Sequence, residues 1–190
     1  EPAKLTGALV GAFHPLQTFA SISYAIENIP GSTFAIEGSG EILNKLQEMA
    51  AALGGNWILL KAEDKVLYHA SAVIACNYFV TLVKMSTDLW QNFGLTSNVA
   101  IKALTPLLKG TLNNLNNVGL PNALTGPISR GDLGTVRKHI NALEKRTPSL
   151  LSTYKELGLQ TIPIALAKGK IDIKKADDLS ELLGGKGQAA

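Results

Sequence analysis

The sequence predicts a short α/β segment over residues 1–62, an all-helical domain over residues 63–184 and a flexible tail over residues 185–190. Two observations lead to this prediction. In the first third, three short apolar runs and one helical pattern follow the order strand, strand, helix, strand, which is typical of α/β proteins. From Asp64 onward, apolar residues instead recur at the three- and four-residue spacing of helices.

The apolar runs of the first segment predict three strands, at residues 9–13, 33–37 and 57–60. Each run is almost continuously apolar, as in a sheet that is covered on both faces. A helix is predicted over residues 41–53, begun by Ser39 or Gly40 and ended by Gly54. One helix cannot cover both faces of a sheet. We therefore expect this segment to be the edge of a larger sheet, and the chain, which starts at Glu1 without a signal-peptide pattern, to be the carboxyl-terminal part of a longer protein.

Helical spacing and cap residues predict six helices in the second segment, at residues 64–93, 97–115, 132–145, 149–157, 162–168 and 172–183. Pro106 lies inside the second of these and predicts a kink or a broken start. Gly158 is expected to end the fourth helix.

The first long helix is apolar around nearly its whole circumference, which indicates burial on all sides. The helical domain is too small to bury this helix alone, so we expect a homodimer through the helical domain. The most apolar stretch, residues 70–83, is shorter than the roughly 20 residues of a membrane-spanning helix and contains Asn77. A core helix is therefore expected, and no membrane partner.

The composition excludes several classes of protein. A hydrophobic fraction of 46% excludes a chain that is disordered throughout. Cys76 is the single cysteine, which excludes a disulfide scaffold and favours a reducing, cytoplasmic setting. A net charge of +3 predicts no nucleic-acid partner. A solvated face is the interpretation of four lysines near the end of the chain: Lys168, Lys170, Lys174 and Lys175. The three histidines are too dispersed to predict a metal site.

Three polar side chains on the long helix are candidates for catalysis. Lys65 and His69 are four residues apart and therefore neighbours, and Asn77 follows about 80° around a regular helix. An ammonium, an imidazole and an amide on an apolar helix need partners or a wet cavity. A histidine or lysine there can act as an acid or base. The alternative is a histidine that is hydrogen-bonded at the domain boundary.

His14 and Pro15 follow the first predicted strand, at the edge of the sheet where ligands of α/β proteins lie. The alternative is that Pro15 simply ends the strand. The sequence Gly38-Ser39-Gly40 resembles part of a dinucleotide-binding loop, but Leu43 stands where the third glycine is needed. A turn and helix cap is the favoured interpretation.

The loop over residues 124–132 precedes a helix that Asp132 is expected to cap. Arg130 in this loop can bind a carboxylate or phosphate through two parallel hydrogen bonds. Together with Thr125 it is the predicted substrate-binding pair. The alternative is that Arg130 forms a structural ion pair.

Four blocks of sequence carry a resemblance to a known protein family: GAFHPLQTF (residues 11–19), FAIEG (34–38), KVLYHASAVIACNYFVTL (65–82) and ALTGPISRGDLGTVRKHINAL (123–143). The chain resembles, over residues 8–184, a bacterial family of predicted oxidoreductases with a Rossmann-like NADP-binding domain followed by a helical domain of unknown function. That helical domain is similar to the one in 6-phosphogluconate dehydrogenase, and relatives include pyrroline-5-carboxylate reductase, prephenate dehydrogenase and ketopantoate reductase.

The resemblance implies that residues 1–62 are the last strands of a Rossmann-like sheet, and that helical domains intertwine in a dimer with the active site between the cofactor domain and the helices. Related dehydrogenases carry a catalytic lysine and an asparagine about one turn apart at the start of the interdomain helix. Lys65 matches the lysine, but His69 stands at the asparagine position. The glycine-rich phosphate loop of the family has no counterpart here, so this chain alone is expected to be inactive.

The resulting expectation is the carboxyl-terminal part of an NADP-dependent oxidoreductase that transfers hydride to or from a small carbonyl, imine or hydroxy-acid substrate. The alternative is a non-catalytic dimerisation and ligand-sensing protein of the same fold. The expected site residues are His69, Lys65 and Asn77 for catalysis, His14 and Pro15 for the cofactor, and Arg130 and Thr125 for the substrate.

Overall fold

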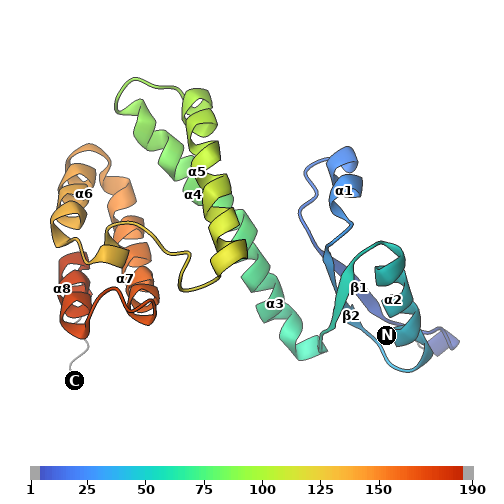
Figure 1. Ribbon diagram of the computed structural model, residues 1–190. Coiled ribbons are helices and arrows are strands. Elements are labelled where there is room, and N and C mark those ends of the chain that lie inside the picture. Colours follow the sequence, from blue (N-terminus) through green and yellow to red (C-terminus); the bar gives the residue numbers. More distant parts are fainter. Residues whose placement is uncertain (1–4, 186–190) are drawn as a thin grey trace. The chain divides into compact units, whose positions relative to one another are not determined.

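The computed structural model describes residues 5–185 and divides into two compact units, Glu1–Leu82 and Val83–Ala190 (Figure 1). Each unit is described by itself. The first contains a three-stranded sheet, and the second contains helices joined by loops, with no strand among its described residues. This confirms an α/β segment followed by helices. The domain boundaries expected after residues 62 and 184 stay predictions, and most of the expected tail, residues 186–190, lies outside the described residues.

The sheet has the strand order β1 (Ala12–Leu16), β2 (Thr33–Glu37), β3 (Asn56–Leu59). Strand β1 runs antiparallel to β2, and β3 runs parallel to β2. The predicted strand at residues 9–13 is wrong in register, because β1 begins at Ala12. His14 and Pro15 therefore lie inside this strand rather than at its carboxyl end. Pro15 is tolerated because β1 is an edge of the sheet, where a missing N–H breaks no ladder between two neighbours.

Helix α2 (Glu41–Ala52) packs on one face of the sheet and closes the core of the first unit. Phe34 and Ile36 are almost completely buried, and the Phe34 ring stacks on Phe13 with 4.6 Å between ring centroids. Gly55 is required at the entry to β3, because a Cβ there would lie 2.5 Å from the Phe34 ring. A further helix, α1 (Ile22–Asn28), connects β1 to β2 and was not predicted.

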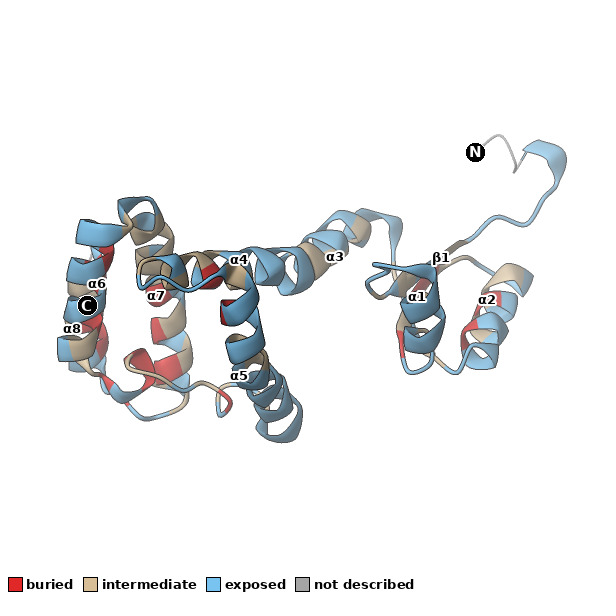
Figure 2. Cartoon of the chain, turned by 90° about the horizontal axis from the view of Figure 1, so that it is seen from above, coloured by how far each residue is buried: buried red, intermediate tan, exposed pale blue. Residues whose placement is uncertain are grey.

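The long helix predicted over residues 64–93 is present as three consecutive segments: α3 (Lys65–Ala72), a π-helical turn η3 (Val73–Asn77) and α4 (Tyr78–Gln91). A 3₁₀ turn, η2 (Ala62–Asp64), precedes it. The prediction of a buried core helix is wrong for the chain by itself, because α3 and η3 contain no buried residue and α4 only Thr87 (Figure 2). By length and apolar composition alone, the stretch Ala62–Gln91 could cross a membrane, with a mean hydropathy of 1.6 over its most apolar window.

The second unit contains four further helices and two 3₁₀ turns: α5 (Ser97–Val118), η4 (Ile128–Arg130), α6 (Leu133–Arg146), η5 (Pro148–Leu150), α7 (Leu151–Ala167) and α8 (Ile173–Leu183). Helices α6, α7 and α8 pack together around a core that includes Val136, Ile162 and Leu179 (Figure 2). The cap predicted at Asp132 is confirmed, since its side chain accepts a hydrogen bond from a backbone N–H of the first turn, and Thr96 caps α5 in the same way. Asp64 stands at the N-cap of α3 without a side-chain cap bond.

Two predicted helix boundaries are wrong. The broken start predicted for α5 is absent, because the helix runs from Ser97 through Pro106, while a kink at Pro106 stays a prediction. Helix α7 is one continuous helix where two were predicted, and Gly158 lies in its interior. A Cβ on Gly158 would lie 2.9 Å from both methyl groups of Leu183. Gly158 is therefore a site of close packing between α7 and α8, not a helix terminator.

Candidate functional site

A cavity of about 370 Å³ in the first unit lies on the face of the sheet opposite α2. Because side chains alternate along a strand, His14, Ala35 and Glu37 share this face, while Phe34 and Ile36 point to the core under α2. Helix α3 supplies the other wall. The cavity lies at the carboxyl ends of β2 and β3, which is where ligands bind in α/β sheets. Its lining residues are Ala12, Phe13, His14, Ala35, Ile36, Glu37, Leu60, Lys65, Tyr68 and His69.

An ion pair between Lys65 and Glu37 connects the two walls of this cavity. Lys65 is the first residue of α3, and Glu37 is the last residue of β2. Both side chains are more than a third exposed, so the pair contributes little to stability. The ion pair instead fixes the position of the Lys65 ammonium in the lining of the cavity.

Tyr68, which lines the same cavity, carries an unsatisfied hydrogen-bond donor. Its hydroxyl is buried and has no hydrogen-bond partner among the residues that the structure describes. Burial raises the pKa of this phenol above its ordinary value of 10.0, so it remains protonated in the neutral range. The His14 ring lies edge-on to the Tyr68 ring, with 5.8 Å between centroids. A buried hydroxyl without an acceptor is rare in native proteins, which makes Tyr68 a candidate functional residue.

Tyr154, a partly buried tyrosine of α7, has a hydrogen-bond partner for its hydroxyl. The Tyr154 hydroxyl lies 3.0 Å from Nδ1 of His139, and burial raises its pKa as well. Tyr154 and His139 satisfy each other, so this pair needs no ligand. Tyr68 differs because its buried hydroxyl has no such partner among the described residues.

The structure brings together three of the predicted site residues, Lys65, His69 and His14. Pro15 does not line the cavity, because it points to the other face of β1. Asn77 does not line it either. The π-helical turn over Val73–Asn77 breaks the regular 100° step, so the 80° separation from His69 predicted for an α-helix does not apply.

Glu37 and Tyr68 were missed as site residues. Tyr68 had a usable signal, because it lies three residues after Lys65 and therefore on the same helix face. Glu37 had a weaker one, the position of a carboxylate at the end of an otherwise apolar strand.

A second cavity, of about 470 Å³, lies within the second unit and contains both predicted substrate-binding residues, Thr125 and Arg130. Lys168 and Lys170 also line it. The interpretation of Lys168 as part of a solvated face is wrong, because its ammonium donates to the backbone carbonyls of Asn122 (2.9 Å) and Leu124 (2.6 Å).

Asp132 caps α6 directly after this loop and gives a prediction for pH dependence. Its carboxylate accepts from the Thr135 backbone N–H (2.9 Å) and hydroxyl (2.7 Å), and these bonds, with the nearby Arg130 charge, lower its pKa below 3.8. A pKa that is lower in the folded state means that this contribution to stability is complete above about pH 4 and is lost as the pH falls through the folded-state pKa.

Asp132→Asn provides the matched variant, because asparagine also caps helices but does not titrate in this range. We expect the wild type to have the higher melting temperature at neutral pH, and the difference to shrink as the pH is lowered from 5 to 2. A difference that stays constant over this range would show that the ionised carboxylate makes no special contribution.

The three-stranded sheet, the helices that follow it and the cavity at the strand ends define an α/β unit joined to a helical unit. More specifically, the chain belongs to the family described as Domain of unknown function (DUF2520), whose model matches residues 32–161. The comparison with curated proteins finds no match.

Two solved structures are similar to the chain. Protein TM1727 from Thermotoga maritima is 27% identical with a TM-score of 0.73, and the match covers 84% of this chain and 62% of that one. The putative NADP oxidoreductase BF3122 from Bacteroides fragilis is 22% identical with a TM-score of 0.64, covering 80% and 57%. The chain thus spans about three fifths of the length of the solved structures that it matches.

The turn at Gly38-Ser39-Gly40 does not fit the pyrophosphate of a dinucleotide. It precedes α2 as a cap, as favoured above, with Gly40 at the N-cap. The first turn of α2 carries Glu41, whose charge opposes an anion at the helix N-terminus. Lys65 is the cation beside this turn, and it is already paired with Glu37. This turn is therefore not suited to bind the pyrophosphate of a dinucleotide.

Proposed function

We propose that the chain is part of a cytoplasmic NADP-dependent oxidoreductase that acts on a small carbonyl, imine or hydroxy-acid substrate. The observation that supports this most is the cavity lined by Tyr68, Lys65, His14 and His69, of which the Tyr68 hydroxyl has no hydrogen-bond partner among the described residues. The likeness to the Bacteroides fragilis NADP oxidoreductase supports the reaction class, and the single free cysteine, Cys76, is compatible with a reducing compartment.

The chain's own residues suit the proton side of such a reaction. Reduction of a carbonyl places negative charge on its oxygen, which must be stabilised and protonated. A protonated Tyr68 is a hydrogen-bond donor for that oxygen, and the Lys65 ammonium adds positive charge beside it. We assign the final proton transfer to His69 or Lys65. Roles for Asn77 in orienting the substrate and for His14 and Pro15 near the cofactor are also part of this proposal.

The test uses the natural protein in which this chain occurs. Purified protein is mixed with NADPH and a panel of small 2-oxo acids, cyclic imines and aldehydes, and the absorbance of the reduced nicotinamide is followed; hydroxy acids are tested with NADP in the reverse direction. We expect turnover with at least one member. NADPH binding without turnover, together with unchanged binding in His69→Ala, would support the non-catalytic, ligand-sensing alternative.

We also propose that the protein is a homodimer through its helical part. Apolar side chains are more than half exposed along the long helix and α5, at Val66, Leu67, Ile74, Tyr78, Val80, Leu107, Leu112 and Val118. Single monomeric proteins seldom expose so many large apolar side chains on adjacent turns, and such surfaces mark protein–protein or membrane contacts. A second copy would cover them.

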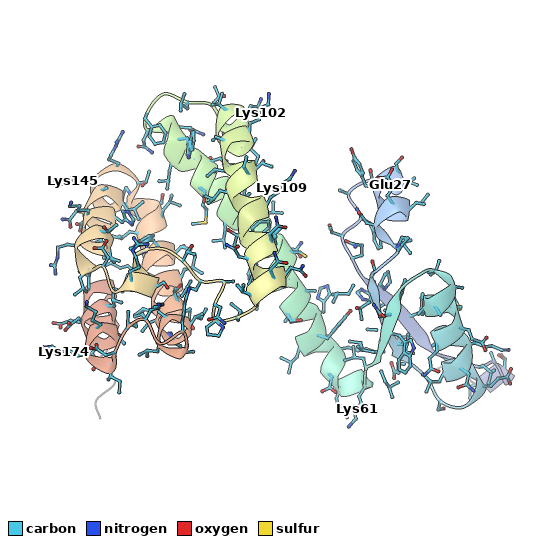
Figure 3. The ribbon with its side chains drawn as sticks, viewed as in Figure 1. Glu27, Lys61, Lys102, Lys109, Lys145 and Lys174 are labelled. Carbon is cyan, nitrogen blue, oxygen red and sulfur yellow. The ribbon has the colours of Figure 1, made fainter. Side chains whose placement is uncertain are left out.

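The prediction is a dimer at micromolar concentration in sedimentation velocity. Leu107→Asp in α5 is expected to shift the population to monomer with an unchanged helical circular-dichroism spectrum. Asn113→Asp adds the same charge to the same exposed helix, which also carries Lys102 and Lys109 (Figure 3), and is expected to stay dimeric. A wild-type monomer, or flotation of the protein with lipid vesicles, would contradict the proposal.

A further inference from the structure

We infer that the cavity of the second unit binds a phosphate group. Three separate segments form this cavity: the loop over residues 124–126, the turn η4 that ends at Arg130, and the connection between α7 and α8 that carries Lys168 and Lys170. The cavity lies wholly within the second unit. The inference is therefore independent of the oxidoreductase chemistry proposed for the first unit.

The charges that line the cavity are all positive. Arg130, Lys168 and Lys170 contribute three cations, and none of its lining residues is acidic. The nearest carboxylate along the loop is that of Asp132, and both of its oxygens accept hydrogen bonds from Thr135. Like charges gathered in one hollow repel one another, so an anion that enters it relieves this repulsion.

Two of these cations form no direct bond through their side chains. Within residues 5–185, neither Arg130 nor Lys170 forms a side-chain hydrogen bond or a salt bridge. Arg130 acts on the Asp132 carboxylate through its charge, without the close contact of a structural ion pair. Lys168 is different, because the carbonyls of Asn122 and Leu124 hold its ammonium in place. An ammonium has three N–H groups, so one of them remains for a ligand.

The loop itself adds one free neutral donor and room for a ligand. The Thr125 hydroxyl has no hydrogen bond to any residue that the structure describes, whereas the buried Ser129 hydroxyl donates to the Leu124 carbonyl. Gly126 has a φ of +96°, and nothing lies within 4 Å of the position that a Cβ would take. A ligand can thus approach the backbone here, and a residue with a side chain would be strained.

The number of free cations favours a phosphate over a single carboxylate. A phosphate monoester carries about −1.5 to −2 charges at neutral pH and three acceptor oxygens. Arg130 can bind two of those oxygens through its planar fork, while Lys170 and the remaining Lys168 proton reach others. One carboxylate would neutralise only one of the two unpaired cations.

The experiment is a titration of the whole chain with inorganic phosphate and with phenyl phosphate at low ionic strength, followed by backbone amide chemical shifts and by calorimetry. We expect the shifts to concentrate at residues 124–131 and 168–170. Arg130→Met and Lys170→Met are each expected to weaken binding at least about tenfold, as for the loss of a charge-assisted hydrogen bond.

Lys174→Met is the matched control, because Lys174 is an exposed lysine of α8 that does not line the cavity (Figure 3). It is expected to bind phosphate like the wild type. Equal weakening by Lys174→Met would reduce the effect to general surface charge and overturn the inference. Acetate binding as tightly as phosphate would also overturn it, in favour of a carboxylate site. If phosphate binds but no NADPH turnover is found, this inference stands and the proposed enzyme activity does not.

Discussion

Replacing Tyr68 with phenylalanine is expected to lower kcat/KM of the natural protein by about 100-fold or more, the usual effect of removing a hydrogen-bond donor to a developing oxyanion. This expectation rests on the proposed reaction. The substitution removes one oxygen and leaves the ring that contacts His14 in place. The measurement is the rate of NADPH oxidation with the best substrate of the panel, compared with Tyr24→Phe, which alters an exposed tyrosine of α1.

The same substitution should not destabilise the fold, because the Tyr68 hydroxyl has no partner to lose among the described residues. An unchanged melting temperature would therefore separate a chemical role from a structural one. Burial raises the pKa of Tyr68 above 10.0, so its proton is present throughout the neutral range, and the rate should lose this donor only in strongly alkaline solution. Wild-type activity in Tyr68→Phe would remove Tyr68 from the mechanism.

Local sequence pattern was sufficient for most of the helices and for the order of the elements. Helix α2 was predicted within one residue of its observed bounds, because its apolar period and its flanking glycines agree. The bounds of β1 were predicted wrongly, because the apolar run over residues 9–13 shows which residues are hydrophobic but not which residues form hydrogen bonds with a neighbouring strand. Pairing with β2 decides the register, and it places His14 opposite Ala35.

The helix boundaries predicted at Pro106 and Gly158 were wrong for a related reason. The effects of proline and glycine as helix breakers are averages over exposed helices, and tertiary packing overrides them. Gly158 is buried against Leu183, so its missing side chain allows α7 and α8 to approach closely instead of ending α7. Pro106 likewise lies within a continuous α5.

The candidate site shows what spacing alone cannot provide. Lys65 and His69 were found because they are neighbours on one helix, and Arg130 because it lies in a polar loop. Their partners come from elsewhere in the chain: Glu37 lies on a strand 28 positions before Lys65, and Lys168 lies at the end of α7. Only the fold reveals these long-range neighbours, and they change the chemistry, because they distinguish a paired ammonium from an unpaired one.

The largest expected loss of stability in the second unit follows from Leu179→Ala in α8. Leu179 has no exposed surface and packs in the core among Val136, Ile140 and Ile162. Truncation of a fully buried leucine removes apolar burial and leaves a cavity that its neighbours fill only in part, at a cost of about 2–5 kcal/mol in the free energy of unfolding. Urea denaturation, followed by circular dichroism at 222 nm where helices absorb, measures this cost.

Ile173→Ala is the matched control, because Ile173 lies in the same helix and is 74% exposed. Alanine has the higher helix propensity, so this variant should be neutral or slightly more stable.

The two variants also test whether α8 supports the phosphate site. Lys168 and Lys170 precede α8, so if packing of α8 holds this segment, Leu179→Ala should weaken phosphate binding as well, while Ile173→Ala should not. Equal stabilities of the two variants would show that Leu179 is not a core residue of the second unit.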